Sequence, residues 1–140
     1  MHPKYERAQA LSREVIGAGV EVHKILGPGL LESIYEKCLL RELELLSFSA
    51  VTQTEVRIEY KGEIFTEELR FDILVEDCLL VEVKAVQEIH PIHKAQLLSY
   101  MKLLDVLIGL LMNFHEVRLV DGVSRMILRG ADVTEGKYDG

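Results

Sequence analysis

Two carboxylates and an amine lie close together on two adjacent apolar segments of this 140-residue chain. Asp72 lies in the segment FDILVE, and Glu82 and Lys84 lie in LLVEVKA, after a short turn. Side chains alternate between the two faces of a strand, so Glu82 and Lys84 should point the same way. Apolar neighbours on both sides of each acid indicate the margin of a buried sheet, where an unpaired carboxylate is costly and a divalent cation relieves that cost. The pattern predicts a metal site on a hairpin, and its alternative is a cluster that pairs internally on a sheet surface.

This arrangement resembles the core motif of the PD-(D/E)XK nuclease superfamily, in which an Asp ends one strand and a Glu-x-Lys lies on the next. Phe71-Asp72 stands here in place of the Pro-Asp pair, which is a departure from the motif. Gln96 and Tyr100 in HKAQLLSY are four residues apart and so share one face of a helix that follows the hairpin. They resemble the Gln-x-x-x-Tyr pair of the RecB-like and lambda-exonuclease-like branches.

A third motif narrows the resemblance. GPGLLESIYEKCL contains Gly29, Glu32 and Tyr35 in the spacing Gly-x-x-Glu-x-x-Tyr. By this resemblance, which runs from about Ile16 to Phe114, the chain is identified as a member of the GxxExxY family within the superfamily. Three motifs in the right order are far more specific than any one of them alone.

The resemblance implies a nuclease that hydrolyses phosphodiester bonds in DNA, with RNA as the alternative, and that uses Mg or Mn. Oxygen ligands fit these ions better than zinc, which prefers His or Cys. The residues expected to bind the metal ion are Glu32, Asp72, Glu82 and the backbone carbonyl of Val83. The residues expected to take part in catalysis are Asp72, Glu82, Lys84, which would assist the attacking water, Gln96 and Tyr100. Tyr35 and His93 are expected to contact the substrate.

Each of the supporting residues also has a structural interpretation. Glu32 alone is also commonly found on a solvated helix face, with Tyr35 packed in the core. For Gln96 and Tyr100, a helix whose tyrosine covers the core carries equal weight. A noncatalytic subunit of a nucleic-acid-processing or defence assembly, with the same fold, therefore stays open as the alternative function.

Composition limits the classes of protein to which the chain can belong. It is 49% hydrophobic, which suits one compact domain over residues 1–140. The net charge of -7 and the lack of a Lys/Arg-rich run count against tight nonspecific binding of a polyanion. No apolar run has the length of a membrane span and the N-terminus has no signal-peptide pattern, so we expect a cytoplasmic protein without a membrane partner. An exposed sheet edge or helix would allow a homodimer or a larger assembly.

Periodicity predicts an α/β fold with a restriction-endonuclease-like core, in which helices flank a mixed central β-sheet. We expect helices at 5–25, 30–46 and 92–105, and strands at 54–60, 64–75, 79–85, 106–114 and 126–130. The strands at 79–85 and 106–114 should be parallel neighbours, because a helix connects them. Residues 131–140 are polar and contain glycine, so we expect this segment to be a fraying tail.

Overall fold

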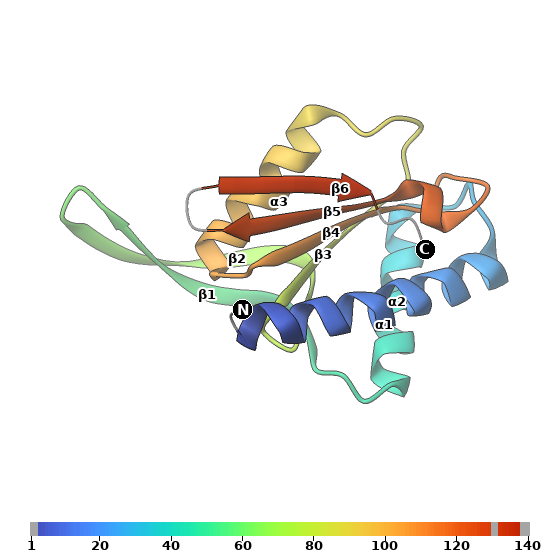
Figure 1. Ribbon diagram of the computed structural model, residues 1–140, viewed down its shortest axis with the longest axis horizontal. Coiled ribbons are helices and arrows are strands. Elements are labelled where there is room, and N and C mark those ends of the chain that lie inside the picture. Colours follow the sequence, from blue (N-terminus) through green and yellow to red (C-terminus); the bar gives the residue numbers. More distant parts are fainter. Residues whose placement is uncertain (1–2, 130–131, 138–140) are drawn as a thin grey trace.

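Apolar side chains at helical spacing produce helices close to the expected ranges. The computed structural model describes residues 3–129 and 132–137 (Figure 1). Its helices are α1 (Pro3–Leu26), α2 (Glu32–Leu45), α3 (Pro91–Leu104) and the short 3-10 helix η1 (Leu119–Gly122). Each α-helix begins and ends within two residues of its expected position. None of the helices in this part of the chain combines the length and the apolar character that a bilayer-spanning segment needs.

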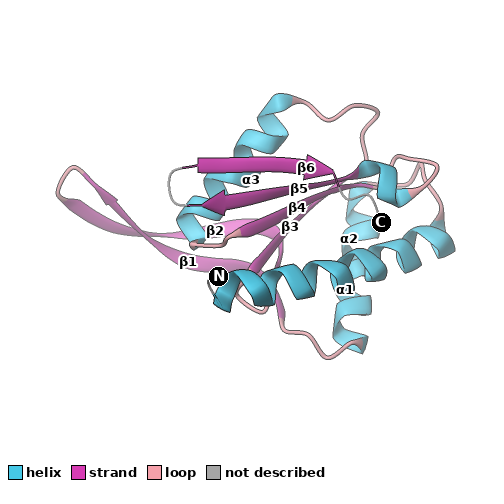
Figure 2. Ribbon diagram, in the orientation of Figure 1, coloured by secondary structure: helices cyan, strands magenta, loops and turns pink. Residues whose placement is uncertain are grey.

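The strands of the described residues form one mixed sheet, in the order β1-β2-β3-β4-β5-β6. They are β1 (Ala50–Tyr60), β2 (Glu63–Val75), β3 (Leu79–Lys84), β4 (Ile108–Asn113), β5 (Val123–Arg129) and β6 (Asp132–Lys137). β3 and β4 are parallel and adjacent, which confirms the expected crossover pair, and the other neighbours are antiparallel. The predicted α/β architecture, a mixed sheet flanked by helices, is confirmed (Figure 2).

The expectation for the C-terminal segment needs a correction. Residues 132–137 do not fray from the fold but pair as β6 with β5, from Arg129↔Asp132 to Ser124↔Lys137. Backbone hydrogen bonding to an available sheet edge does not require apolar side chains, so the polar composition gave no sign of this strand. Residues 131 and 138–140 of the expected tail lie outside the described residues.

Two apolar cores lie on the two faces of the sheet. Helices α1 and α2 pack on a face that includes the strand residues Leu79, Val81, Val83, Leu110 and Met112. Helix α3 packs on the opposite face, against Leu80, Leu111 and Met126, through Leu97 and Met101. Gly109 permits this close approach, because a Cβ atom there would lie 2.6 Å from the Met101 sulfur. Glu82 follows Leu80 by two residues on β3 and therefore faces the α3 side.

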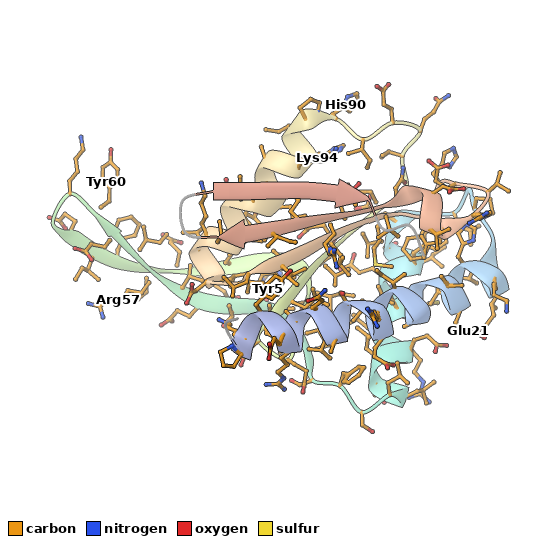
Figure 3. All side chains as sticks on the ribbon, in the orientation of Figure 1. Tyr5, Glu21, Arg57, Tyr60, His90 and Lys94 are labelled. Carbon is orange, nitrogen blue, oxygen red and sulfur yellow. The ribbon has the colours of Figure 1, made fainter. Side chains whose placement is uncertain are left out.

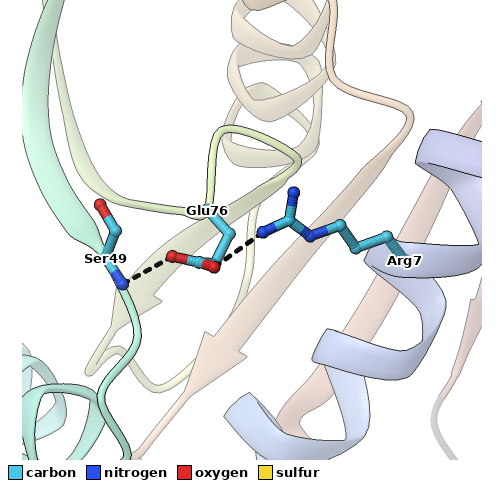
Figure 4. Close-up of polar contacts among 3 residues, drawn as sticks. All are labelled: Arg7, Ser49 and Glu76. Atoms are coloured by element: carbon cyan, nitrogen blue, oxygen red, sulfur yellow. Dashed lines mark hydrogen bonds and ion pairs between the residues drawn. The ribbon is translucent and has the colours of Figure 1, made fainter.

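A three-residue polar contact ties the N-terminal helix to two turns of the sheet (Figure 4). One Glu76 carboxylate oxygen accepts a hydrogen bond from Arg7 Nη2 of α1 at 2.7 Å, and the other accepts from the Ser49 backbone N–H at 2.7 Å. Glu76 stands in the turn between β2 and β3, and Ser49 directly precedes β1. The contact therefore fixes the base of the β1–β2 hairpin, whose far end projects away from the helices (Figure 1).

Candidate active site

Strands β2 and β3 separate at the predicted carboxylates. Their ladder pairs Val75 with Leu79, Leu74 with Leu80 and Ile73 with Val81, and it extends no further. On its other side, β2 is irregular: residues 71–73 stand opposite the single residue 52 of β1. A β-bulge of this kind bends a strand and changes the direction of its side chains. Asp72 lies within the bulge, at the point where the two strands diverge.

The carboxylates of Asp72 and Glu82 take the place of the missing ladder bonds. Asp72 Oδ2 accepts a hydrogen bond from the Val83 backbone N–H at 2.7 Å. Glu82 Oε1 lies 3.5 Å from the Asp72 backbone N–H, at the long limit of a hydrogen bond. Each acid thus contacts the backbone of the opposite strand. The structure brings together the two residues that the sequence predicts as the centre of the site.

Glu82 is unusually costly to ionise in this position. Its side chain is buried, with 5% of the residue surface exposed. Burial, followed by the nearby Asp72 charge, raises the pKa of Glu82 to about 8, while Lys84 acts in the opposite direction. Lys84 is on the same face of β3, two residues further on, and is half-buried. Two carboxylates and one ammonium group therefore share a small, partly desolvated region.

Helix α2 adds a carboxyl that the sequence analysis missed. Burial, then the Asp72 and Glu32 charges, raise the pKa of Glu36, and Lys84 opposes them. Glu36 follows Glu32 by four residues, so the two share a helix face. That spacing was visible in the sequence, but only Glu32 belonged to the resembling motif. The negative charge of the site is thus drawn from both the sheet and α2.

Tyr35 does not fit the predicted contact with a substrate. It is fully buried, its hydroxyl donates to the Gly27 carbonyl at 2.6 Å, and the same oxygen accepts from the Leu30 N–H at 3.0 Å. Its ring stacks on Phe114 with the centroids 4.5 Å apart. Gly27 and Gly29 have φ angles of +75° and +94°, which glycine adopts at little cost. Tyr35 therefore fixes the tight connection between α1 and α2.

The first turn of α3 carries His93 towards Lys84. His93 Nδ1 accepts a hydrogen bond from the His90 N–H at 3.1 Å, and the His90 side chain accepts from the His93 backbone in return. This reciprocal cap satisfies N–H groups that the start of a helix leaves without partners. Partial desolvation, then the Lys84 and His90 charges, lower the pKa of His93. His93 also lines a hollow of about 670 Å³ with Val86, Gln87, Glu88 and His90.

The other two predicted residues of α3 are less closely tied to the carboxylates. Gln96 is exposed, whereas Tyr100 is half-buried and packs against the apolar core beneath α3. Within the described residues, neither forms a hydrogen bond with Asp72, Glu82 or Lys84. Their predicted catalytic roles remain predictions, and the packing of Tyr100 agrees with the structural interpretation.

Asn113 supports the end of β3, and the sequence analysis did not single it out. It is buried, its Oδ1 accepts from the Val86 N–H at 3.1 Å, and its Nδ2 donates to the Val86 carbonyl at 2.9 Å. The neighbouring Phe114 N–H donates to the Lys84 carbonyl at 2.8 Å. The only signal in the sequence was a polar side chain at the end of the apolar run VLIGLLMNF. These bonds hold the backbone that carries Lys84.

The donor atoms at the site suit a hard cation bound by few protein ligands. Across residues 3–129 and 132–137, no three His, Cys, Asp or Glu side chains form a group that could hold a metal ion. Mg²⁺ commonly takes only one or two carboxylates and keeps several waters. The adjacent Asp72 and Glu82 meet that lower requirement. Burial and then the Asp72 charge raise the pKa of Glu82, and a bound cation would offset both. Glu32 does not belong to this pair of carboxyl groups, and its role as a metal ligand stays a prediction.

A family model described as the PD-(D/E)XK nuclease superfamily matches residues 9–126. The matched segment contains every residue discussed above as part of the site. No curated protein and no solved structure shows significant similarity to the chain.

Proposed function

Because the chain belongs to the PD-(D/E)XK nuclease superfamily, we propose that it is a metal-dependent nuclease that hydrolyses phosphodiester bonds in DNA, with RNA as the alternative substrate. The observation that carries the proposal is the separation of β2 from β3 at Asp72 and Glu82, where each acid contacts the backbone of the opposite strand. Lys84 follows Glu82 by two residues on β3 and so points to the same face. We further propose membership of the GxxExxY family, since Gly29, Glu32 and Tyr35 have its spacing.

Asp72, Glu82 and the Val83 carbonyl are the proposed ligands of Mg²⁺ or Mn²⁺. Such an ion, when bound, lowers the pKa of water and neutralises charge on a phosphate. Both carboxylates would have to be ionised to serve as ligands, and Glu82 is protonated near neutral pH in the metal-free protein because its pKa is about 8. Loading of the site should therefore release a proton, and the apparent affinity should rise with pH.

Lys84 and His93 are the proposed groups that act on the substrate. The ammonium group of Lys84 can orient the attacking water and stabilise negative charge on the phosphate oxygens. His93 is neutral near pH 7 because its pKa is lowered, and its Nδ1 accepts the bond from His90. The proton of the neutral ring then lies on Nε2, which leaves His93 a donor suited to a phosphate oxygen.

A cleavage assay tests this proposal. Purified protein is incubated with single- and double-stranded DNA and RNA, with Mg²⁺, Mn²⁺ or a chelator. We expect metal-dependent cleavage that is lost in Asp72→Asn and in Lys84→Ala. Lys24→Ala, which removes an exposed amine in the last turn of α1, is the matched control and should retain activity. Absence of cleavage on all four substrates with either metal, over a broad pH range, contradicts the proposal.

A noncatalytic module is the second candidate, and two observations favour it. The net charge is -7, and the described residues hold no group of three metal-binding side chains. Calorimetric titration with Mn²⁺ separates the candidates. Binding that is lost in Glu82→Gln supports the nuclease, whereas a wild-type protein that takes up no ion supports the interaction module.

A further inference from the structure

The outer part of the β1–β2 hairpin is a two-stranded ribbon with an exposed apolar face. Ile58 stands opposite Phe65, and Tyr60 lies two residues beyond Ile58 on the same face. Tyr60 is 62% exposed and Phe65 is 44% exposed. Figure 3 shows Arg57 and Tyr60 on opposite sides of the ribbon, far from the helices. An isolated two-stranded ribbon is only marginally stable in water, so this one would gain from a further strand.

The charge of the ribbon excludes a polyanion as that partner. Residues 54–69 contain five glutamates against one arginine and one lysine. Moreover, Glu55 lies directly opposite Glu68, and like charges in that position are destabilising. Within the ribbon the position directly opposite Glu55 holds an acid and not a cation, and a suitable partner strand would place a cation opposite Glu55 on its free side.

β1 itself supplies that cation when two copies meet. β1 is at the end of the strand order, so its outer backbone edge has no partner strand among the described residues. Glu55 and Arg57 flank Val56 and point to the same face. In an antiparallel pair centred on Val56, Glu55 of each copy stands opposite Arg57 of the other, and Thr54 stands opposite Ile58. The register therefore makes two opposite-charge pairs and places a cation beside each Glu55.

We propose that β1 pairs in antiparallel orientation with β1 of a second copy of this chain, centred on Val56. A twofold axis at Val56 joins the two sheets into one continuous sheet, in an interface that uses the same surface on both copies. Natural edge strands that must stay unpaired commonly carry proline or lysine. β1 contains neither between Ala50 and Tyr60.

Sedimentation equilibrium over roughly 1–200 µM, the range in which modest interfaces dissociate, tests the pairing. We expect a reversible dimer of the wild type. Arg57→Glu replaces both attractions by repulsions, so the dimer should be roughly tenfold to a hundredfold weaker. The double exchange Glu55→Arg with Arg57→Glu restores both pairs with reversed signs and should restore the dimer. Arg13→Glu, the same charge change on an exposed residue of α1, is the control and should leave the mass unchanged.

Three results would overturn the proposal. The first is a wild type that stays monomeric over the whole range. The second is a dimer whose dissociation constant Arg57→Glu does not change. The third is a loss of dimer in Arg57→Glu that the double exchange does not reverse. Circular dichroism shows whether the Arg57→Glu variant folds. If it does not fold, the doubly exchanged variant alone decides the question: a dimer supports the pairing and a monomer overturns it. The readout is molecular mass, so the result is independent of whether the protein cleaves nucleic acid.

Discussion

The buried carboxyl of Glu82 should make the stability of the metal-free protein depend on pH. Burial, and then the charge of Asp72, raise the pKa of Glu82 from 4.5 to about 8. The folded state therefore binds this proton more tightly than the unfolded state does. The stabilisation is fully present below about pH 4.5, decreases as the pH rises, and is lost once the pH exceeds about 8.

The size of the effect follows from the same two values. Between them, each pH unit lowers the free energy of unfolding by about 1.4 kcal/mol. Over the whole window the loss amounts to at most about 5 kcal/mol, a large part of the stability of a typical domain. Glu82→Gln removes the titration but keeps an oxygen that can accept from the Asp72 N–H. The variant should therefore match the wild type near pH 4.5 and exceed it by several kcal/mol at pH 9.

Urea denaturation followed by circular dichroism, in chelator, at pH 5, 7 and 9 measures this difference. Comparison with the variant cancels the contributions of other acids, and Glu21→Gln, an exposed residue of α1, serves as the matched control. Excess Mg²⁺ at pH 8 should then stabilise the wild type but not Glu82→Gln. Parallel stability curves for wild type and Glu82→Gln between pH 5 and 9 would refute the reasoning, because a titrating Glu82 cannot leave them parallel.

Three further substitutions have defined outcomes. Lys84→Ala should reduce metal-dependent cleavage by about 100- to 1000-fold while changing the melting temperature little, as measured by initial rates and thermal denaturation. Tyr35→Phe removes the hydroxyl between Gly27 and Leu30 and should lower the free energy of unfolding by about 1–3 kcal/mol, as measured by urea denaturation. An unchanged free energy of unfolding would show that the two hydrogen bonds are dispensable. Asn113→Ala removes the side-chain partners of the Val86 backbone N–H and carbonyl, so hydrogen exchange in this loop should accelerate, whereas unchanged protection would contradict the assigned role.

Much of the architecture could be predicted because local patterns were consistent with the tertiary structure. The alternating residues of β3 and the apolar run of β4 led directly to their parallel pairing and to the shared face of Glu82 and Lys84. The side-chain environment was harder to predict. Spacing alone placed Tyr35 beside Glu32, but it could not tell that the hydroxyl is held by Gly27 and fully enclosed.

Other features depend on contacts between distant segments. Glu36 belongs to the site only because α2 packs where β2 and β3 diverge, and the bulge around Asp72 depends on the β1 register. The reciprocal cap of His90 and His93 uses a residue type that is uncommon at helix starts, so no standard pattern pointed to it. Strand β6 is formed by backbone pairing, which side-chain polarity does not report.

The hydrogen bond from the Val83 N–H to Asp72 Oδ2 also limits how position 72 can change through evolution. The carboxylate that would serve chemistry also keeps a strand's amide satisfied, so selection for folding continues even where selection for turnover has ended. In a lineage that drifted towards a purely architectural role, asparagine could retain this acceptor and should be tolerated. Alanine or valine would leave the amide unsatisfied and should be disfavoured. Descendants that have lost the activity are therefore expected to keep a near-copy of the acid, which would make them resemble working enzymes.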